Sequence, residues 1–88
     1  MSTRLLVWTA GAWEDYLHWQ TEDRRTLKRI NLLLADVLRD DPLEGIGKPE
    51  PLKHALAGAW SRRIDETNRL VYTATDLQII VLQARYHY

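Results

Sequence analysis

Five residues in the second half of the chain have side chains suited to proton transfer and phosphate binding. Glu50 lies between two prolines, Arg63 and Arg69 flank a short polar segment, and His87 and Tyr88 close the chain. A carboxylate can act as a general base, and histidine changes charge near neutral pH and can act as a general acid. Arginine presents a planar fork that binds phosphate oxygens. These residue types therefore suit acid–base chemistry at a phosphate ester.

RNA carries its own nucleophile, the 2′-hydroxyl. Its cleavage needs a base to take the proton of that hydroxyl, an acid to protonate the leaving 5′-oxygen, and cations to stabilise the phosphorane. Glu50 is our candidate base and His87 our candidate acid, and Arg69 and Arg63 are placed at the non-bridging oxygens. Tyr88 can stack on a base or bond a phosphate. This reaction requires neither a metal ion nor a cofactor.

Each residue alone also has a simpler interpretation. An arginine pair on a sheet is most often solvated surface, a histidine near a terminus is usually incidental, and Glu50 fits a solvated loop. Lys48 and Lys53, on either side of Glu50, are ordinarily surface charges. The prediction therefore rests on the combination of residues.

Hydrophobic periodicity predicts the elements that must position these side chains. Residues 3–8 are apolar and partly β-branched, which is typical of a strand. Thr9 is predicted to cap a helix over residues 10–20, with Trp13, Tyr16 and Leu17 as its buried stripe.

A second helix is predicted to begin at Thr21, with Glu22 and Asp23 in its first turn, and to end before Pro42. Its apolar face comprises Leu27, Ile30, Leu34, Val37 and Leu38.

The glycines and prolines of residues 43–51 predict a loop. Three strands are expected after it, over residues 59–65, 69–73 and 78–85. The order strand, helix, helix, strand, strand, strand predicts one α+β domain over residues 1–88, with a mainly antiparallel sheet packed against two N-terminal helices.

Pairing Ile64 with Leu70 places the first hairpin turn at residues 66–68. Alternation then puts Arg63 and Arg69 together on the opposite face. The last strand is expected to carry Gln83, Arg85 and His87 on one face.

Composition excludes several classes of protein. A chain of 88 residues without cysteine has no disulfide scaffold and no thiolate metal site, and it fits the reducing cytoplasm. No apolar run is long enough for a signal peptide or a membrane span. The formal net charge is zero, but residues 45–88 hold six basic and four acidic side chains against six and eight in residues 1–44. A polyanion site is therefore expected in the second half.

Four motifs, in order and with compatible spacing, resemble the YoeB (Txe) toxins, a branch of the RelE-like bacterial toxins. They are GKPEPLKH at 47–54, WSRRI at 60–64, RLVY at 69–72 and the closing RYHY. The similarity extends back through WEDYLHWQ at 13–20. Thr67 and Asn68 stand where YoeB-like sequences often have an acid and a histidine.

The resemblance implies a RelE-like fold and a metal-independent endonuclease that cuts mRNA in the A site of the 70S ribosome. It implies Glu50 as base, His87 as acid, Arg69 as transition-state stabiliser and Tyr88 as a further catalytic residue. Phosphate binding is implied for Lys53 and Arg63, and our other RNA-binding candidates are Arg62, Lys48 and Arg85. The expected partners are a YefM-like antitoxin, the ribosome with its mRNA, and a second copy of the chain.

Two other classes of protein also fit these residues. A non-catalytic module could bind RNA or a partner protein through the same cationic face. A degenerate toxin could bind only its antitoxin and repress its own operon. Glu50 favours the enzyme, because a phosphate binder gains nothing from a carboxylate beside its lysines.

Overall fold

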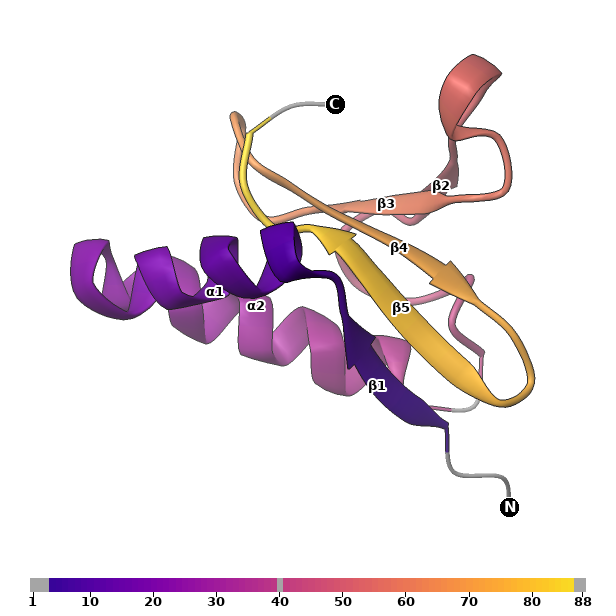
Figure 1. The fold of residues 1–88 in the computed structure, drawn as a ribbon, viewed down its shortest axis with the longest axis horizontal. Helices are drawn as coiled ribbons and strands as arrows, with labels where there is room; N and C mark the ends of the chain where they lie inside the picture. The colour runs from indigo at the N-terminus through magenta and orange to yellow at the C-terminus, as the bar shows by residue number, and fades with distance from the viewer. Residues whose placement is uncertain (1–3, 40, 87–88) are drawn as a thin grey trace.

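Two helices and a five-stranded sheet make up the fold in the computed structural model, which describes residues 4–39 and 41–86 (Figure 1). The elements in chain order are β1 (Leu5–Trp8), α1 (Ala10–Glu22), α2 (Arg24–Val37), β2 (Glu50–Pro51), the 3₁₀ helix η1 (His54–Leu56), β3 (Trp60–Arg63), β4 (Arg69–Ala74) and β5 (Gln78–Gln83).

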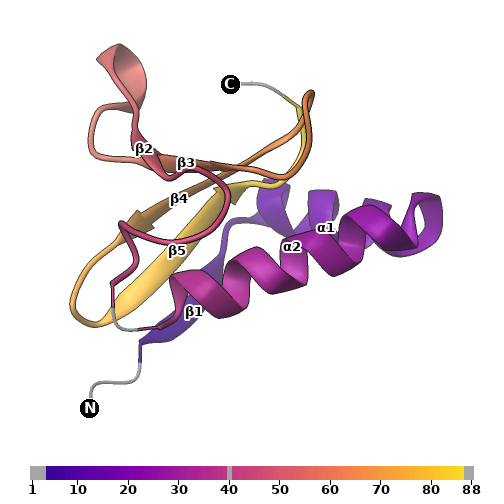
Figure 2. The ribbon, with the colours of Figure 1, turned by 180° about the vertical axis from the view of Figure 1, so that it is seen from behind.

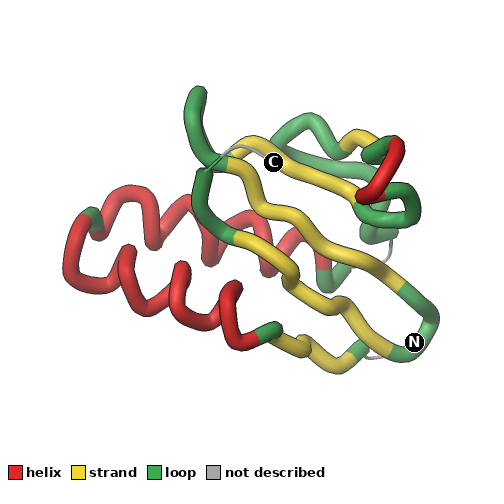
Figure 3. The backbone as a smooth tube through the Cα atoms, turned by 45° about the horizontal axis from the view of Figure 1, so that its top comes forward, coloured by secondary structure: helices red, strands yellow, loops and turns green. Residues whose placement is uncertain are grey.

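The strands lie in the order β1-β5-β4-β3-β2. β1 runs parallel to β5, and every other neighbouring pair is antiparallel. Both helices lie side by side and cover one face of this sheet (Figures 2 and 3). The predicted α+β architecture is confirmed. The sequence prediction missed β2, because two residues within a proline-rich loop carry no periodic signal.

The start of α1 agrees with its prediction and its buried face does not. Thr9 caps the helix, and its hydroxyl accepts a hydrogen bond from the Ala12 backbone N–H at 3.1 Å. Ala12 is fully buried, whereas Trp13 and Leu17 are 44% and 43% exposed. The predicted stripe is therefore wrong at Trp13 and Leu17, whereas Tyr16 is half-buried and packs against the core. Trp13 instead joins Trp8 and Tyr16 in an aromatic cluster at the surface.

Helix α2 begins at Arg24, three residues after the predicted start. The Asp23 carboxylate caps it by accepting hydrogen bonds from the backbone N–H groups of Arg25 and Thr26 and from the Thr26 hydroxyl. These bonds lower the pKa of Asp23 against the opposing effect of desolvation. Asp23 is thus the N-cap of α2 and does not lie in its first turn, contrary to the prediction.

The main core lies between the helices and the sheet. Its buried side chains are Ala12, Ile30, Leu33, Leu34, Val37, Ile64, Leu70, Tyr72, Ile79, Val81 and Ala84. A second, smaller cluster on the opposite face of the sheet consists of Leu52, Ala59 and Val71 with Leu82 packed against them.

The structure corrects the prediction that Arg62 binds RNA. Arg62 is fully buried, and its guanidinium forms an ion pair with Asp36 and donates to the Tyr72 hydroxyl at 3.0 Å. It also donates to the backbone carbonyls of Pro42 and Glu44, at 2.9 Å and 2.8 Å. Arg62 therefore holds the loop that leads to β2 and presents no charge to a ligand.

The hairpin joining β3 to β4 has a different register from the predicted one. Leu70 pairs with Arg62, and Arg63 lies directly opposite Arg69. The Asp65 carboxylate accepts backbone hydrogen bonds from Thr67 and Asn68, at 2.8 Å and 2.7 Å, and so closes the turn one residue earlier than expected. The predicted adjacency of Arg63 and Arg69 is confirmed.

Within the described residues, neither α1 nor α2 has the length and apolar character needed to cross a bilayer.

Candidate active site on the outer face of the sheet

The face of the sheet that points away from the helices carries Glu50 together with the two arginines. Glu50 is the partner of Ser61 across β2 and β3, and Arg63 is the partner of Arg69 across β3 and β4. Paired residues of antiparallel strands share a face, and so do residues two apart along a strand. Glu50 and Arg63 are thus diagonal neighbours, with Cα atoms about 7–8 Å apart. One carboxylate and two guanidinium groups belong to a single surface.

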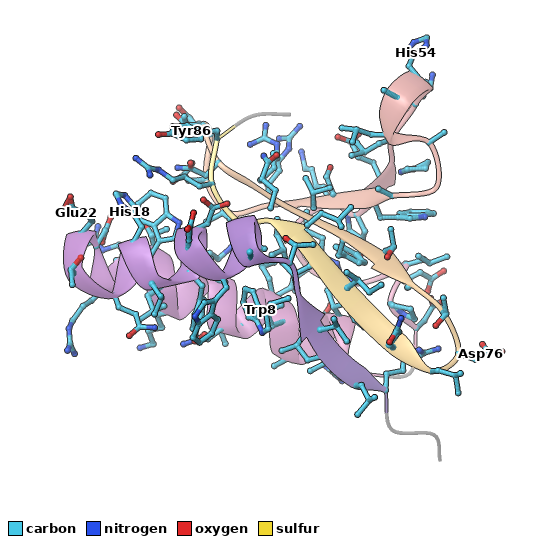
Figure 4. All side chains as sticks on the ribbon, viewed as in Figure 1. Trp8, His18, Glu22, His54, Asp76 and Tyr86 are labelled. Carbon is cyan, nitrogen blue, oxygen red and sulfur yellow. The ribbon has the colours of Figure 1, made fainter. Side chains whose placement is uncertain are left out.

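The segment around Glu50 exposes positive charge beside the carboxylate. Lys48 and Lys53 are both exposed, one on each side of β2. Glu50, Pro51, Leu52, Lys53, His54 and Leu56 line a pocket of about 330 Å³. His54 projects from η1 at the tip of this region (Figure 4).

Arg69 is held more firmly than Arg63. Arg69 is 8% exposed, and its Nη1 donates to the backbone carbonyls of Asp65 and Asn68, at 2.7 Å and 3.2 Å. Arg63 is exposed. Desolvation acts to raise the pKa of Asp65, but hydrogen bonds from Asn68 and Thr67 and the charge of Arg69 outweigh it and lower that pKa. The Asp65 carboxylate is therefore ionised, and it belongs to the same turn whose carbonyls hold the Arg69 guanidinium.

The end of the chain leaves the sheet earlier than predicted. A bulge opposite Val71 and Tyr72 pairs Val71 with Gln83, so that Gln83 points outward and Ala84 is buried. The Ala84 carbonyl accepts a hydrogen bond from Trp19 Nε1 at 2.8 Å. The Ala84 N–H donates to the Asp15 carboxylate at 3.0 Å. The opposite directions of Gln83 and Ala84 agree with the prediction, but the predicted strand to residue 85 is two residues too long, because α1 binds Ala84 where the chain leaves β5.

The turn brings the C-terminal residues to the start of β4. The Tyr86 N–H donates to Asn68 Oδ1 at 2.6 Å, and the Tyr86 carbonyl accepts from the Arg69 N–H at 3.0 Å. The Arg85 guanidinium carbon lies 4.4 Å from the centre of the Tyr86 ring. His87 and Tyr88 lie outside the described residues.

Sequence reasoning missed two residues that organise this end of the sheet. Asn68 was predicted only as a turn residue, and Gln83, whose Nε2 donates to the Tyr86 carbonyl at 3.1 Å, only as a member of one strand face. The spacing Asp65-x-x-Asn68 is a signal for a side chain that bonds the backbone of its own turn. No sequence signal marks the contact between Asn68 and Tyr86, which lie 18 residues apart.

The chain is similar over most of its length to a known family of proteins. Residues 8–88 match the family described as the YoeB-like toxin of bacterial type II toxin-antitoxin systems. The toxin YoeB of Streptomyces coelicolor is 59% identical over 83 residues, which cover 94% of this chain and 98% of that protein. The chain belongs to the YoeB family of toxins.

Solved structures of YoeB proteins share the fold. The YoeB dimer from Staphylococcus aureus superposes with a TM-score of 0.90 at 44% identity, covering 99% of this chain and 100% of that one. The YoeB-YefM complex from the same organism gives 0.87 at 45% identity, covering 97% and 99%. A chain of the RelBE2 toxin-antitoxin complex from Mycobacterium tuberculosis gives 0.73 at 26% identity, covering 99% and 94%. The fold is therefore the RelE-like α+β fold.

Proposed function

We propose that this YoeB-family toxin is an endoribonuclease that cleaves mRNA in the ribosomal A site and so stops translation in the cytoplasm. The observation that carries the proposal is the shared outer face of β2, β3 and β4. It combines a carboxylate, Glu50, with the cross-strand pair of Arg63 and Arg69.

The reaction begins with proton transfer from the 2′-hydroxyl of the substrate to Glu50. The 2′-oxygen attacks the adjacent phosphorus, and the bond from phosphorus to the 5′-oxygen breaks. His87 donates a proton to that leaving oxygen. The products are a 2′,3′-cyclic phosphate, or the 3′-phosphate formed by its hydrolysis, and a 5′-hydroxyl. Because the nucleophile belongs to the RNA, no metal ion or covalent intermediate takes part.

The arginines act on the charge that develops at phosphorus. Arg69, whose Nη1 is held by two carbonyls, offers donors that need little reorganisation when the phosphorane forms. Arg63 is exposed and can bind a non-bridging oxygen or a neighbouring phosphate. Lys48, Lys53 and Arg85 bind the RNA backbone, and Tyr88 stacks on a base or bonds a phosphate. The ribosome orients the message so that the reacting groups meet in line.

The proposed protein partners follow from the relatives. A YefM-like antitoxin is expected to bind this toxin as YefM binds the S. aureus YoeB. An acidic and apolar segment of it would cover Arg63, Arg69 and His87 or displace residues 85–88. A homodimer like that of the S. aureus protein is the expected free form.

The decisive experiment is primer extension on a defined mRNA with the purified protein. One arm contains EDTA and no ribosomes, and the other contains ribosomes with magnesium restored. Wild type is compared with Glu50→Gln, which keeps the shape of the side chain but cannot accept the proton. We expect cuts at A-site codons in the ribosome arm, reduced about 10²-fold or more in the variant, since a general base contributes on the order of 10²–10⁴-fold.

Glu14→Gln, on the exposed surface of α1, is the matched control and should cut like wild type. Cleavage by Glu50→Gln at the wild-type rate would contradict the role of Glu50. No cutting by wild type in either arm would leave a non-catalytic module that binds RNA or antitoxin.

A further inference from the structure

The C-terminal segment adopts a backbone conformation that needs outside support. Tyr86 has φ of 67°, in the left-handed region that residues other than glycine adopt uncommonly. Tyr86 is also the residue directly before His87, the proposed general acid. Whatever holds the Tyr86 backbone therefore acts on the residue directly before the proposed acid.

Three groups bond the Tyr86 backbone. Its N–H donates to Asn68 Oδ1 at 2.6 Å, and its carbonyl accepts from the Arg69 N–H at 3.0 Å and from Gln83 Nε2 at 3.1 Å. Arg69 is the first residue of β4 and Asn68 directly precedes it. Asn68 is the only side chain bonded to the Tyr86 N–H in the part of the chain that the structure describes.

The Asp65 carboxylate fixes the orientation of the Asn68 amide. Asn68 Nδ2 donates to the two carboxylate oxygens at 3.2 Å and 3.1 Å, and Asn68 is 8% exposed. An ionised carboxylate only accepts hydrogen bonds, so the NH₂ group of the amide must face Asp65. Oδ1 is thereby directed at Tyr86, and a rotated amide would lose both contacts.

The same turn holds the guanidinium of Arg69. Arg69 Nη1 donates to the backbone carbonyls of Asp65 and Asn68. The transition-state arginine and the segment that carries the acid are thus both tied to residues 65–68. A shift of this turn would move both the Arg69 guanidinium and the Tyr86 backbone.

We infer that Asn68 is a positioning residue of the nuclease site, which fixes the C-terminal segment by bonding the Tyr86 backbone while its own amide is oriented by Asp65. This inference rests on the proposed nuclease function. Asn68 itself acts through the segment and transfers no proton.

The test compares Asn68→Ala with Thr67→Ala, a neighbour in the same turn whose side chain is exposed. We expect Asn68→Ala to lower kcat about 10–100-fold, since a misplacement of about 1 Å can reduce a rate by about 10². KM should stay within about threefold, because the cationic face is intact. Thr67→Ala should match wild type in both constants.

Hydrogen exchange of the Tyr86 amide, followed by NMR, is the second readout. Asn68→Ala should remove the protection of the Tyr86 amide against exchange, while the amides of α2 stay protected. Thr67→Ala should leave the Tyr86 amide protected. If Asn68→Ala unfolds the domain, Asn68→His replaces it, because a neutral imidazole has one acceptor nitrogen and one N–H donor. The histidine variant should keep Tyr86 protected and kcat within about tenfold of wild type.

A folded Asn68→Ala with wild-type kcat, or with a protected Tyr86 amide, would overturn the inference. So would a folded Asn68→His that cuts at the wild-type rate with Tyr86 unprotected. Failure of the wild type to cut RNA would instead refute the proposed function. The exchange of Tyr86 would then still decide whether Asn68 holds the segment.

Discussion

At the scale of single residues, two arginines adjacent in sequence have opposite roles. Arg63 is exposed on the outer face, whereas Arg62 points into the core and is satisfied there by Asp36, Tyr72 and backbone carbonyls. Successive residues of a strand face opposite sides of the sheet, which separates the two. A buried ion pair tolerates the removal of one partner poorly, because the remaining charge is then uncompensated.

Asp36→Asn should therefore lower the free energy of unfolding at neutral pH by about 3 kcal/mol, as expected when a buried pair loses one charge. Arg39→Gln is the control, since Arg39 contacts the same carboxylate at 3.4 Å but its side chain is 77% exposed. We expect it to change stability by less than about 1 kcal/mol. Urea unfolding of both variants measures the difference, and equal effects would contradict the structural role given to Arg62.

The same comparison has a predicted pH dependence. The hydrogen bond from Arg62 lowers the pKa of Asp36 from its ordinary value of 3.8, against the opposing effect of burial. A depressed folded-state pKa adds stability that is present above the unfolded value and is lost as the pH falls through the folded one. The gap between wild type and Asp36→Asn should therefore be constant above about pH 5 and shrink below it. A gap that widened in acid would refute this linkage.

At the scale of elements, the loop between α2 and β2 decides where Glu50 is placed. The Arg62 guanidinium donates to two backbone carbonyls of this loop, and the Gly47 carbonyl accepts from the Arg63 N–H at 2.7 Å. Gly47 has φ of 82°, and a Cβ there would come within 2.7 Å of Leu33 Cδ2 and 3.1 Å of Arg62 Cβ. Both neighbours are fully buried and have little room to move. The loop can therefore follow this path only with glycine at 47.

Gly47→Ala should lower the free energy of unfolding by about 1–3 kcal/mol more than Gly58→Ala does, because only the first variant overpacks the core. Gly58 has a similar φ of 96° but no heavy atom within 4 Å of an added Cβ, so both variants share the backbone strain. Thermal or urea unfolding gives the comparison. Equal losses of stability in the two variants would mean that backbone strain explains the whole effect and that contact of the added Cβ with Leu33 contributes nothing.

At the scale of the whole molecule, the formal net charge is zero, so the proposed RNA binding requires a local positive patch. The two faces of the sheet carry different kinds of side chain. One is covered by helices and carries the main core, and the other carries Glu50, Arg63 and Arg69. Phosphate contacts made by such a patch release counterions, and binding then weakens as salt rises.

Arg63→Gln should weaken binding of a short single-stranded RNA and reduce the slope of log K against log salt by about 0.7, the amount expected for one phosphate contact to a single strand. Lys28→Gln, on the exposed surface of α2, should leave the slope unchanged. Fluorescence anisotropy over a salt series measures both. A reduced slope with Lys28→Gln and none with Arg63→Gln would move the binding surface to the helices.

Local patterns were sufficient to predict the order of helices and strands, the Thr9 cap and the proximity of Arg63 to Arg69. Each of these depends on neighbours within a few residues or on the period of a strand. The burial of Arg62, the exposure of Trp13 and Leu17, the existence of β2 and the contact of Asn68 with Tyr86 were not predictable in this way. They depend on contacts between residues far apart in the chain, such as Asp36 with Arg62 and Trp19 with Ala84. A charged or aromatic side chain carries the same local signal whether its partners lie in solvent or in the core, so its burial follows from the packing of the folded chain.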